Sequence, residues 1–360
     1  NEKYIACFHT LSLQESTSER FCLLGKAHHR LKQFGPAIDA YQKAIELDNH
    51  NDTALTQLAL AYVSAHRFED AVSSFTKSIA VMRNATQKSL AFLRLMIQLK
   101  KLDEADQCII NIMRVSNDMS PTTISSYLEL QGDIQMNKKN YTEAIKIYNQ
   151  SLNTIEKIIE ADIKNAFFKQ IKHIASNLLY KIATSYEENG ETEKSIDFYH
   201  RSLLYDDKNS KTVCSLFELF KKRYDIDRCK KVCSDYLNID PHNESIALLF
   251  TSTEVNSLSA SISCIRNVLD AHPFYIKSLV RLVEICARSG RLHLAYHYIT
   301  MAKSSNPSFF FSVGLYYQYL GNIEKSLFYL KKACGSNKWR LPAKMSIISI
   351  IIQVCSMKFL

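Results

Sequence analysis

The chain has 360 residues, of which 46% are hydrophobic and 22% are charged, as in a folded protein and unlike a disordered one. Only eight glycines and six prolines occur, which argues against an all-β or loop-rich protein and favours a chain that is almost entirely helical. The net charge of +9 comes mostly from short basic pairs such as Lys138-Lys139 and Lys230-Lys231, with no long polybasic run. We therefore expect solvated helix faces and no nucleic-acid partner.

The ten cysteines are scattered through apolar stretches without any CxxC pair, which predicts buried free thiols in a reducing compartment. No basic segment followed by an apolar core opens the chain, so no signal peptide is visible. The longest apolar stretch, from Ile347 to Cys355, is too short for direct membrane insertion. The chain begins at Asn1 and stops inside an apolar helical pattern, so we expect it to be a piece of a longer protein.

A repeat of 34 residues organises the chain from residue 18 onward. Ala37, Ala71 and Ala105 are spaced 34 apart, and each is followed four residues later by a large apolar residue, as in Ala37 and Tyr41. Leu24 and Gly25 precede the first alanine, which completes the pattern of a tetratricopeptide repeat, a pair of antiparallel helices. One such pair cannot bury its apolar faces alone, so successive pairs must stack.

The sequence therefore predicts an all-α tetratricopeptide solenoid, a right-handed superhelix of about nine helix pairs. Residues 1–16 fit the second helix of a preceding repeat, and 342–357 fit the first helix of a following one. The repeats fill 18–158 and 176–340, with a helical insert at 159–175 where the spacing breaks. The expected units are 18–51, 52–85, 86–119, 125–158, 176–209, 210–243, 244–275, 276–306 and 307–340.

Most glycines and half of the prolines occupy places that this repeat explains. Glycines within first helices allow close approach of the second helix, and we expect Gly25 to face Ala37. Glycines directly after first helices fit left-handed cap positions, and prolines fit the ends of second helices. The first set is Gly25, Gly132 and Gly314; the second is Gly190, Gly290 and Gly321; the prolines are Pro241, Pro273 and Pro307.

Two pairs of potential metal ligands lie one helical turn apart. His293 and His297 lack the glutamate of a zinc-protease motif, because Leu294 follows the first histidine, and no third ligand is placed by the sequence. Cys229 and Cys233 occupy the places that alanine and an aromatic residue fill in other repeats, which favours buried packing. Without a phosphate-binding loop or a nucleophile motif, we expect no enzyme, no catalytic residues, no metal and no cofactor.

A partner surface is expected on the first helices, whose unpacked residues line the concave face of a tetratricopeptide stack. The clamp that holds peptide carboxylates is not formed, because its places carry Cys22, Lys26, Gln57 and Ala91. The candidate binding residues are an acidic group followed by an apolar group. They are Glu129, Asp133, Glu187 and Glu188, then Ile246, Phe250, Phe311, Leu315 and Tyr319. The alternative for the apolar group is internal packing beneath a neighbouring unit.

The C-terminal third resembles the tetratricopeptide repeat protein 21 family. The similarity is carried by "RLVEICARSGRL", "MAK" and "GLYYQYLGNIEKSLFYLKKA", and by Trp339, although Lys338 stands where the family has an acid. "SYEENGETEKSIDFYHRSLL" and "LRLMIQLKKLDEADQCI" are similar to its middle region. The unit around Ser259 to Val268 departs from the pattern, because it has no alanine–aromatic pair.

The resemblance implies a non-catalytic scaffold, a peripheral subunit of intraflagellar transport complex A acting in retrograde ciliary transport and in ciliary protein entry. It implies protein partners that combine β-propellers with tetratricopeptide arrays, and a location in the cytoplasm and the cilium, at the axoneme and basal body. The alternative is a stand-alone cytosolic tetratricopeptide adapter that binds a peptide or helix in its concave groove. An RNA-binding array is disfavoured, because the aromatic residues are committed to packing places.

Overall fold

The computed structural model describes residues 17–78, 85–115, 119–161, 167–253 and 257–357. All regular structure in these residues is helical, with nineteen helices and no strand. The predicted all-α solenoid is therefore confirmed: α2 to α19 form nine helix pairs, and α20 follows them. Among the same residues, no helix is both long enough and apolar enough to cross a membrane. The predicted helix at 1–16 lies outside the described residues.

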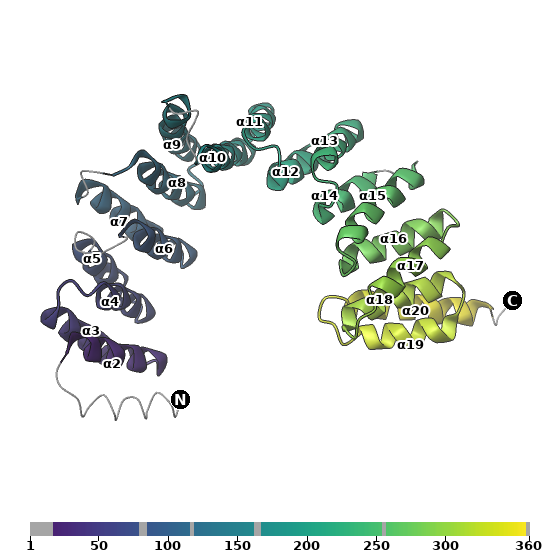
Figure 1. Ribbon diagram of the computed structural model, residues 1–360, viewed down its shortest axis with the longest axis horizontal. Coiled ribbons are helices and arrows are strands. Elements are labelled where there is room, and N and C mark those ends of the chain that lie inside the picture. The colour runs from purple at the N-terminus through teal and green to yellow at the C-terminus, as the bar shows by residue number, and fades with distance from the viewer. Residues whose placement is uncertain (1–16, 79–84, 116–118, 162–166, 254–256, 358–360) are drawn as a thin grey trace. The chain divides into compact units, whose positions relative to one another are not determined.

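The first compact unit of the chain ends at Tyr205 and holds five helix pairs. Their bounds are α2 Ser18–Arg30, α3 Phe34–Leu47, α4 Asp52–Ser64, α5 Phe68–Ser78, α6 Ala85–Gln98, α7 Leu102–Val115, α8 Pro121–Asn137, α9 Tyr141–Ala161, α10 Phe168–Glu188 and α11 Thr192–Tyr205. Each first helix packs mainly against the second helix that follows it, as α2 does against α3 (Figure 1). Neighbouring pairs also contact one another, and one core cluster runs from α2 to α8 while a second joins α9 and α10.

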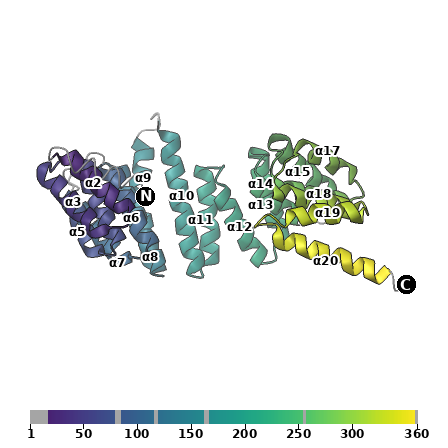
Figure 2. The same ribbon diagram turned by 90° about the horizontal axis from the view of Figure 1, so that it is seen from below.

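The two longest helices of this unit lie where the repeat spacing breaks. Helices α9 and α10 have 21 residues each, whereas α2 and α4 have 13. Figure 2 shows α9 and α10 side by side. The described residues of the 159–175 stretch are the last three of α9, Phe167, which precedes α10, and the first eight of α10. The described part of the extra chain thus lengthens α9 and α10.

Eight of the nine first helices, all those whose following residues the structure describes, end in a common turn with a left-handed residue. After α2, the amide of Lys32 donates to the carbonyl of His29, and the amide of Gln33 donates to the carbonyl of His28. This is the Schellman arrangement, which satisfies the last carbonyls of a helix. Its left-handed residue is the predicted glycine after three first helices and a larger residue after five others. These residues are Gly190, Gly290 and Gly321, and Lys32, His66, Lys100, Lys139 and Tyr224.

The first-helix glycines face an aromatic or leucine side chain of the paired helix. A Cβ placed on Gly25 would lie 2.5 Å from Cε1 of Tyr41, which is fully buried. Gly132 stands in the same relation to Tyr148, and Gly314 to Leu330. The prediction that Gly25 faces Ala37 missed this ring, which supplies the atoms nearest to a Cβ on Gly25. The antiparallel register places the residue sixteen positions later over the glycine, and the residue twelve positions later also lies close in one pair, where the hydroxyl of Ser326 donates to the carbonyl of Gly314.

The second compact unit begins at Asp206 and holds four helix pairs and α20. Their bounds are α12 Ser210–Lys222, α13 Ile226–Ile239, α14 Glu244–Thr253, α15 Leu258–Ala271, α16 Ile276–Arg288, α17 His293–Met301, α18 Pro307–Tyr319, α19 Ile323–Ala333 and α20 Arg340–Met357. Pro241 and Pro273 follow α13 and α15 as expected. Pro307 instead opens α18 at its first position, where a proline costs no hydrogen bond.

Helix α18 lies at the centre of the core of this second unit. It contacts α16, α19 and α20, and most of its residues are buried, from Phe309 to Tyr316. Helix α20 packs on α19 but leaves a row of apolar side chains exposed, including Leu341, Met345, Ile348 and Ile352. That α20 is the first helix of a further repeat stays a prediction.

Candidate partner-binding surfaces

The acidic residues predicted for the concave face are partly neutralised within the chain. Glu129 and Asp133 lie on α8, and Lys181 reaches them from α10, the next first helix. The Lys181 ammonium nitrogen lies 2.7 Å from Glu129 Oε1 and 2.7 Å from both carboxylate oxygens of Asp133. Burial alone would lower the pKa of Lys181, but the charges of Asp133 and Glu129 outweigh it, so the pKa is raised.

Tyr148 completes this polar cluster from α9. Its ring packs on Gly132, and its hydroxyl donates to Asp133 Oδ1 over 2.6 Å. Burial and the neighbouring Asp133 charge both raise the pKa of Tyr148, so the phenol stays protonated and keeps donating. Each carboxylate of the cluster thus already has a donor, which leaves Glu129 and Asp133 less available to a partner.

The other two acidic candidates end α10. Glu187 is half-buried and accepts a hydrogen bond from the hydroxyl of Tyr199 over 3.2 Å. Glu188 is exposed. The structure therefore brings Glu129 and Asp133 into one cluster and leaves Glu188 open to a partner, while a role of these residues in binding stays a prediction.

Three of the five apolar candidates lie in the core. Ile246 is fully buried, and Phe311 and Leu315 are nearly so. The Phe311 ring stacks on Trp339 with ring centres 4.7 Å apart. The expectation that these three line an open groove is wrong, because their side chains are buried. For Phe311 of α18, the cover is Trp339, which follows α19. The alternative of internal packing beneath a neighbouring unit holds for them.

The remaining apolar candidates are more accessible. Phe250 is half-buried on α14, and Tyr319 is 51% exposed at the end of α18. Close to Tyr319 in the chain, Leu320, Ile323 and Phe328 are also exposed. The sequence analysis did not select these three, although Phe328 lies in a helical pattern with Lys325 and Lys332 that could have drawn attention to it.

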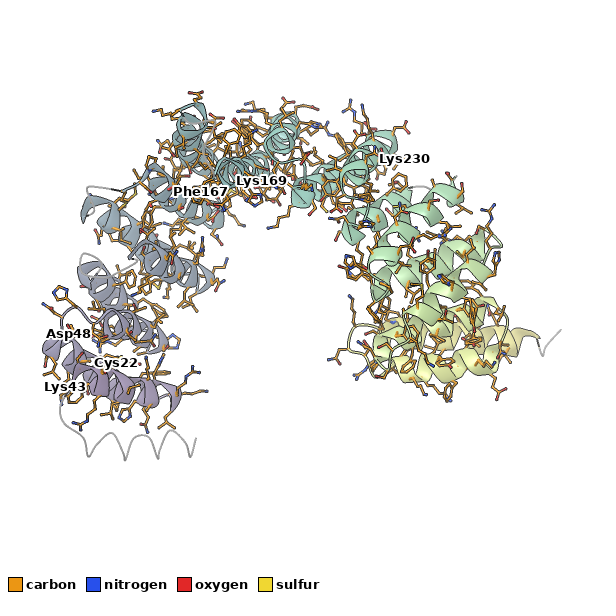
Figure 3. The ribbon with its side chains drawn as sticks, viewed as in Figure 1. Cys22, Lys43, Asp48, Phe167, Lys169 and Lys230 are labelled. Carbon is orange, nitrogen blue, oxygen red and sulfur yellow. The ribbon has the colours of Figure 1, made fainter. Side chains whose placement is uncertain are left out.

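Two hollows open on the first unit. One, of about 420 Å³, lies beside α2 and is lined by residues that include Cys22, Lys26 and Asp48. Figure 3 shows Cys22 and Asp48 at this end of the molecule. The other, of about 620 Å³, lies between α5 and α7 and is lined by Glu69, Asp103 and Glu104, among others.

The histidine and cysteine pairs do not assemble a metal centre in the described part of the chain. There, no group of three or more histidine, cysteine, aspartate or glutamate side chains is placed to hold an ion. Cys229 and Cys233 are fully buried on α13. Burial raises the pKa of both thiols, that of Cys233 to about 12, so both are neutral packing groups at neutral pH.

Family models match most of the chain. The tetratricopeptide repeat protein 21 fourth ARM domain matches residues 55–203, and the fifth ARM repeats domain of the same protein matches residues 247–352. A general tetratricopeptide repeat model matches residues 18–51. Two successive domains of one family therefore follow one another along the sequence.

Individual relatives agree with these matches. Tetratricopeptide repeat protein 21B of Xenopus laevis is 24% identical over 371 residues, which cover 98% of this chain and 27% of that protein. The tetratricopeptide repeat protein 21 homolog of Caenorhabditis elegans is 22% identical, with 97% and 27% covered. The chain thus spans about a quarter of the length of these relatives. A tetratricopeptide repeat protein of Parabacteroides merdae has 14% identity and a TM-score of 0.37, with 75% of this chain and all of that chain covered.

Three findings agree with a tetratricopeptide array. They are the repeat pattern, the stacked helix pairs and the two successive domain matches. Tetratricopeptide arrays are scaffolds that mediate contacts between proteins. The chain is such a scaffold, and it belongs to the tetratricopeptide repeat protein 21 family.

Proposed function

We propose that the chain is a scaffold segment of a peripheral subunit of intraflagellar transport complex A, acting in retrograde ciliary transport and in ciliary protein entry. The observation that carries the proposal is the succession of the fourth and fifth family domains along this sequence. Its partners are subunits that combine β-propellers with tetratricopeptide arrays. Its location is the cytoplasm and the cilium, at the axoneme and basal body.

The architecture suits a subunit that holds others in place. Among the described residues, helix pairs make their main contacts with neighbouring pairs, so outer residues of a pair can bind a partner without loss of the core. The described surface also offers both signs of charge and several exposed apolar side chains, among them Tyr319 and Phe328. Protein interfaces combine such apolar centres with polar rims.

Purification of the full-length protein from ciliated cells tests the proposal. The protein is tagged at its own locus, isolated at moderate salt, and its companions are identified by mass spectrometry. We expect stoichiometric recovery of the propeller-bearing subunits of complex A, and microscopy should place the tag at the basal body and along the axoneme. A version that lacks the residues of this chain serves as the control and should recover fewer companions. Recovery of a single small client and no complex A subunit would contradict the proposal.

One feature favours the second candidate, a stand-alone adapter that binds a peptide in its concave groove. The hollow beside α2 lies on a first helix and combines the cation of Lys26 with the acid of Asp48. Substitution of Lys26 by alanine distinguishes the two functions. An adapter would lose its peptide client, whereas the transport subunit would keep its complex A companions.

A further inference from the structure

One face of α19 combines exposed aromatic and basic side chains. Lys325, Phe328, Tyr329 and Lys332 are spaced three, four and seven residues after the first, so they form one stripe along the helix. Phe328 is 52% exposed, both lysines are exposed, and Tyr329 is half-buried. We call these four residues the α19 stripe. Helix α18 lies beside α19 and supports it (Figure 1).

The lysines of the α19 stripe lie over aromatic rings. Tyr329 stacks on Tyr317 of α18, with ring centres 5.7 Å apart and planes 6° from parallel. The Lys325 ammonium lies 5.3 Å from the Tyr317 ring centre, and the Lys332 ammonium lies 4.2 Å from the Phe328 ring centre. Cations held in this way are attracted by the ring faces, so both charges are fixed in position on the surface.

A related arrangement occurs on α10 and α11. There Asp197 takes the place of Phe328, and Arg201 lies over the second ring of the stack, whereas Lys332 lies over Phe328. Tyr186 stacks on Phe198 with ring centres 5.3 Å apart. Lys194 lies over Tyr186 at 5.5 Å, and Arg201 lies over Phe198 at 4.9 Å. The sequence offsets at the two sites are equal. Counted from the first ring, Tyr186 or Tyr317, the second ring follows after twelve residues, and the two cations follow after eight and fifteen residues. The two sites are thus equivalent places of two repeats.

The two sites differ in how their cations are compensated. On α11, Lys194 pairs with Glu191 at 2.6 Å, and Arg201 lies 3.8 Å from Glu156 of α9. These contacts bring carboxylates of the chain itself next to both cations. The site on α10 and α11 is therefore internally balanced, and an acidic partner would gain little there.

The cations of the α19 stripe have no such compensation. Within the described ranges of the chain, no carboxylate oxygen lies within 4.0 Å of the ammonium of Lys325 or Lys332. Lys331 adds a third exposed positive charge, and Glu324 is the only acid of α19. We propose that the α19 stripe is a docking site for an acidic segment of another protein that carries a large apolar side chain.

The spacing of the stripe suits such a segment. Lys325 and Lys332 are separated by two helical turns, or about 10 Å, with Phe328 between them. Carboxylates at the two ends of the segment would pair with the lysines, and an apolar side chain between them would cover Phe328. Burial of that side chain gives affinity, while the charges give orientation and speed of association.

Other polyanions fit this site less well. Single-stranded nucleic acid is held by several free ring faces on which successive bases stack, but Tyr317 and Tyr329 stack on each other, so Phe328 is the one exposed ring of the α19 stripe. An anionic membrane is held by clusters of four to eight basic residues, whereas α19 has three. An acidic protein segment matches both the small number of charges and the exposed ring.

Peptide selection on the whole 360-residue chain tests the docking site. A random library of 12-residue peptides is panned against the chain and depleted against the K325E/K332E variant, and selected peptides are measured by fluorescence polarisation. We expect peptides with net negative charge and at least one large apolar residue. They should bind K325E/K332E at least tenfold more weakly, and K325Q/K332Q and Phe328→Ala should also weaken them. The matched control K194E/R201E, at the compensated site, should bind as the wild type does.

Three results would overturn the docking site. One is that no selected peptide distinguishes the wild type from K325E/K332E while circular dichroism shows both folded. Another is that the discriminated peptides are not acidic. The third is that phosphatidylserine vesicles or oligouridine, and not peptides, lose binding in the variant. The inference rests only on the scaffold part of the proposed function, so peptide binding can fail while complex A subunits still co-purify, and the reverse.

Discussion

Gly25 lies directly against the ring of Tyr41, so that a Cβ at this glycine would come within 2.5 Å of the ring carbon Cε1. The relation recurs between Gly132 and Tyr148. It shows how the repeat couples its two helices: the missing side chain of one residue makes the space for a large buried ring of the other. A change at either residue must alter the distance between the two helices.

Gly25→Ala should therefore destabilise the chain although alanine favours helices. The added methyl forces the Tyr41 ring or the helices to move, which costs about 1–2 kcal/mol. Gly35→Ala is the control, because nothing lies within 4 Å of a Cβ there and the residue belongs to α3. It should leave stability unchanged or raise it by about 0.5–1 kcal/mol. Urea unfolding followed by circular dichroism measures both, and equal midpoints for the two variants would refute the packing relation.

The left-handed turn residues offer an opposite test. Lys139 has a φ of 62°, which costs a non-glycine residue about 1–2 kcal/mol, more than the entropy that glycine loses on folding. Lys139→Gly should thus stabilise the chain by about 0.5–1 kcal/mol. At the equivalent Gly190, with a φ of 83° and no neighbour within 4 Å, Gly190→Ala should destabilise it by a similar amount. Thermal unfolding decides, and shifts of the same sign in both variants would contradict the argument.

Removal of Lys181 should leave two carboxylates facing each other. The Lys181 side chain is 25% exposed, so we expect Lys181→Met to cost about 1–3 kcal/mol at pH 7, less than a fully buried pair would. The pKa of this lysine is raised in the folded state above its ordinary 10.5. Its contribution is therefore complete below about pH 10 and is lost as the pH rises through the folded pKa.

Urea unfolding of the wild type and Lys181→Met between pH 7 and pH 12 follows this contribution. The difference between the two proteins should shrink only at the alkaline end. Lys146→Met is the matched control, since Lys146 forms an exposed pair with Glu143 and should have no measurable effect. A difference between wild type and Lys181→Met that disappears near pH 8 would show that the cluster does not hold this charge.

The buried thiols should resist modification until the chain unfolds. Cys233 and Cys286 are fully buried, and burial raises the pKa of Cys233 to about 12 and that of Cys286 to about 11. Iodoacetamide at pH 7.5 should label exposed Cys355 quickly and these two only in denaturant. Mass spectrometry of labelled peptides measures the rates. Fast labelling of Cys233 in the native protein would show that α13 opens readily.

The sequence was informative where a residue's role is decided inside its own helix pair. The 34-residue spacing and the left-handed cap at Gly190 depend on local structure, and both were predicted correctly. The Tyr41 ring over Gly25 was not predicted, because the spacing does not fix the register of two antiparallel helices. Phe311 was misplaced for a related reason: its exposure is decided by Trp339, which follows the next helix.

The contact between Lys181 and Asp133 spans 48 residues and two helix pairs. It depends on how one helix pair stacks on the next, and the repeat spacing within a pair carries no signal for that placement. Likewise, whether a carboxylate lies next to the ammonium of Lys332 depends on the fold and cannot be predicted from the sequence around it. Only the comparison with Arg201, at the equivalent place, makes it visible.

The unequal helix lengths imply an unequal resistance to local opening along the chain. Helices α9 and α10, with 21 residues each, pack against each other and against their partners, whereas α14 has 10 residues and α17 has 9. In an array held together by nearest neighbours, each pair adds its own stability and that of its two interfaces. Backbone amides should therefore exchange with solvent most slowly in α9 and α10 and fastest around α14 and α17. Local unfolding should therefore begin at the short helices, where a partner could change the structure at the lowest energetic cost.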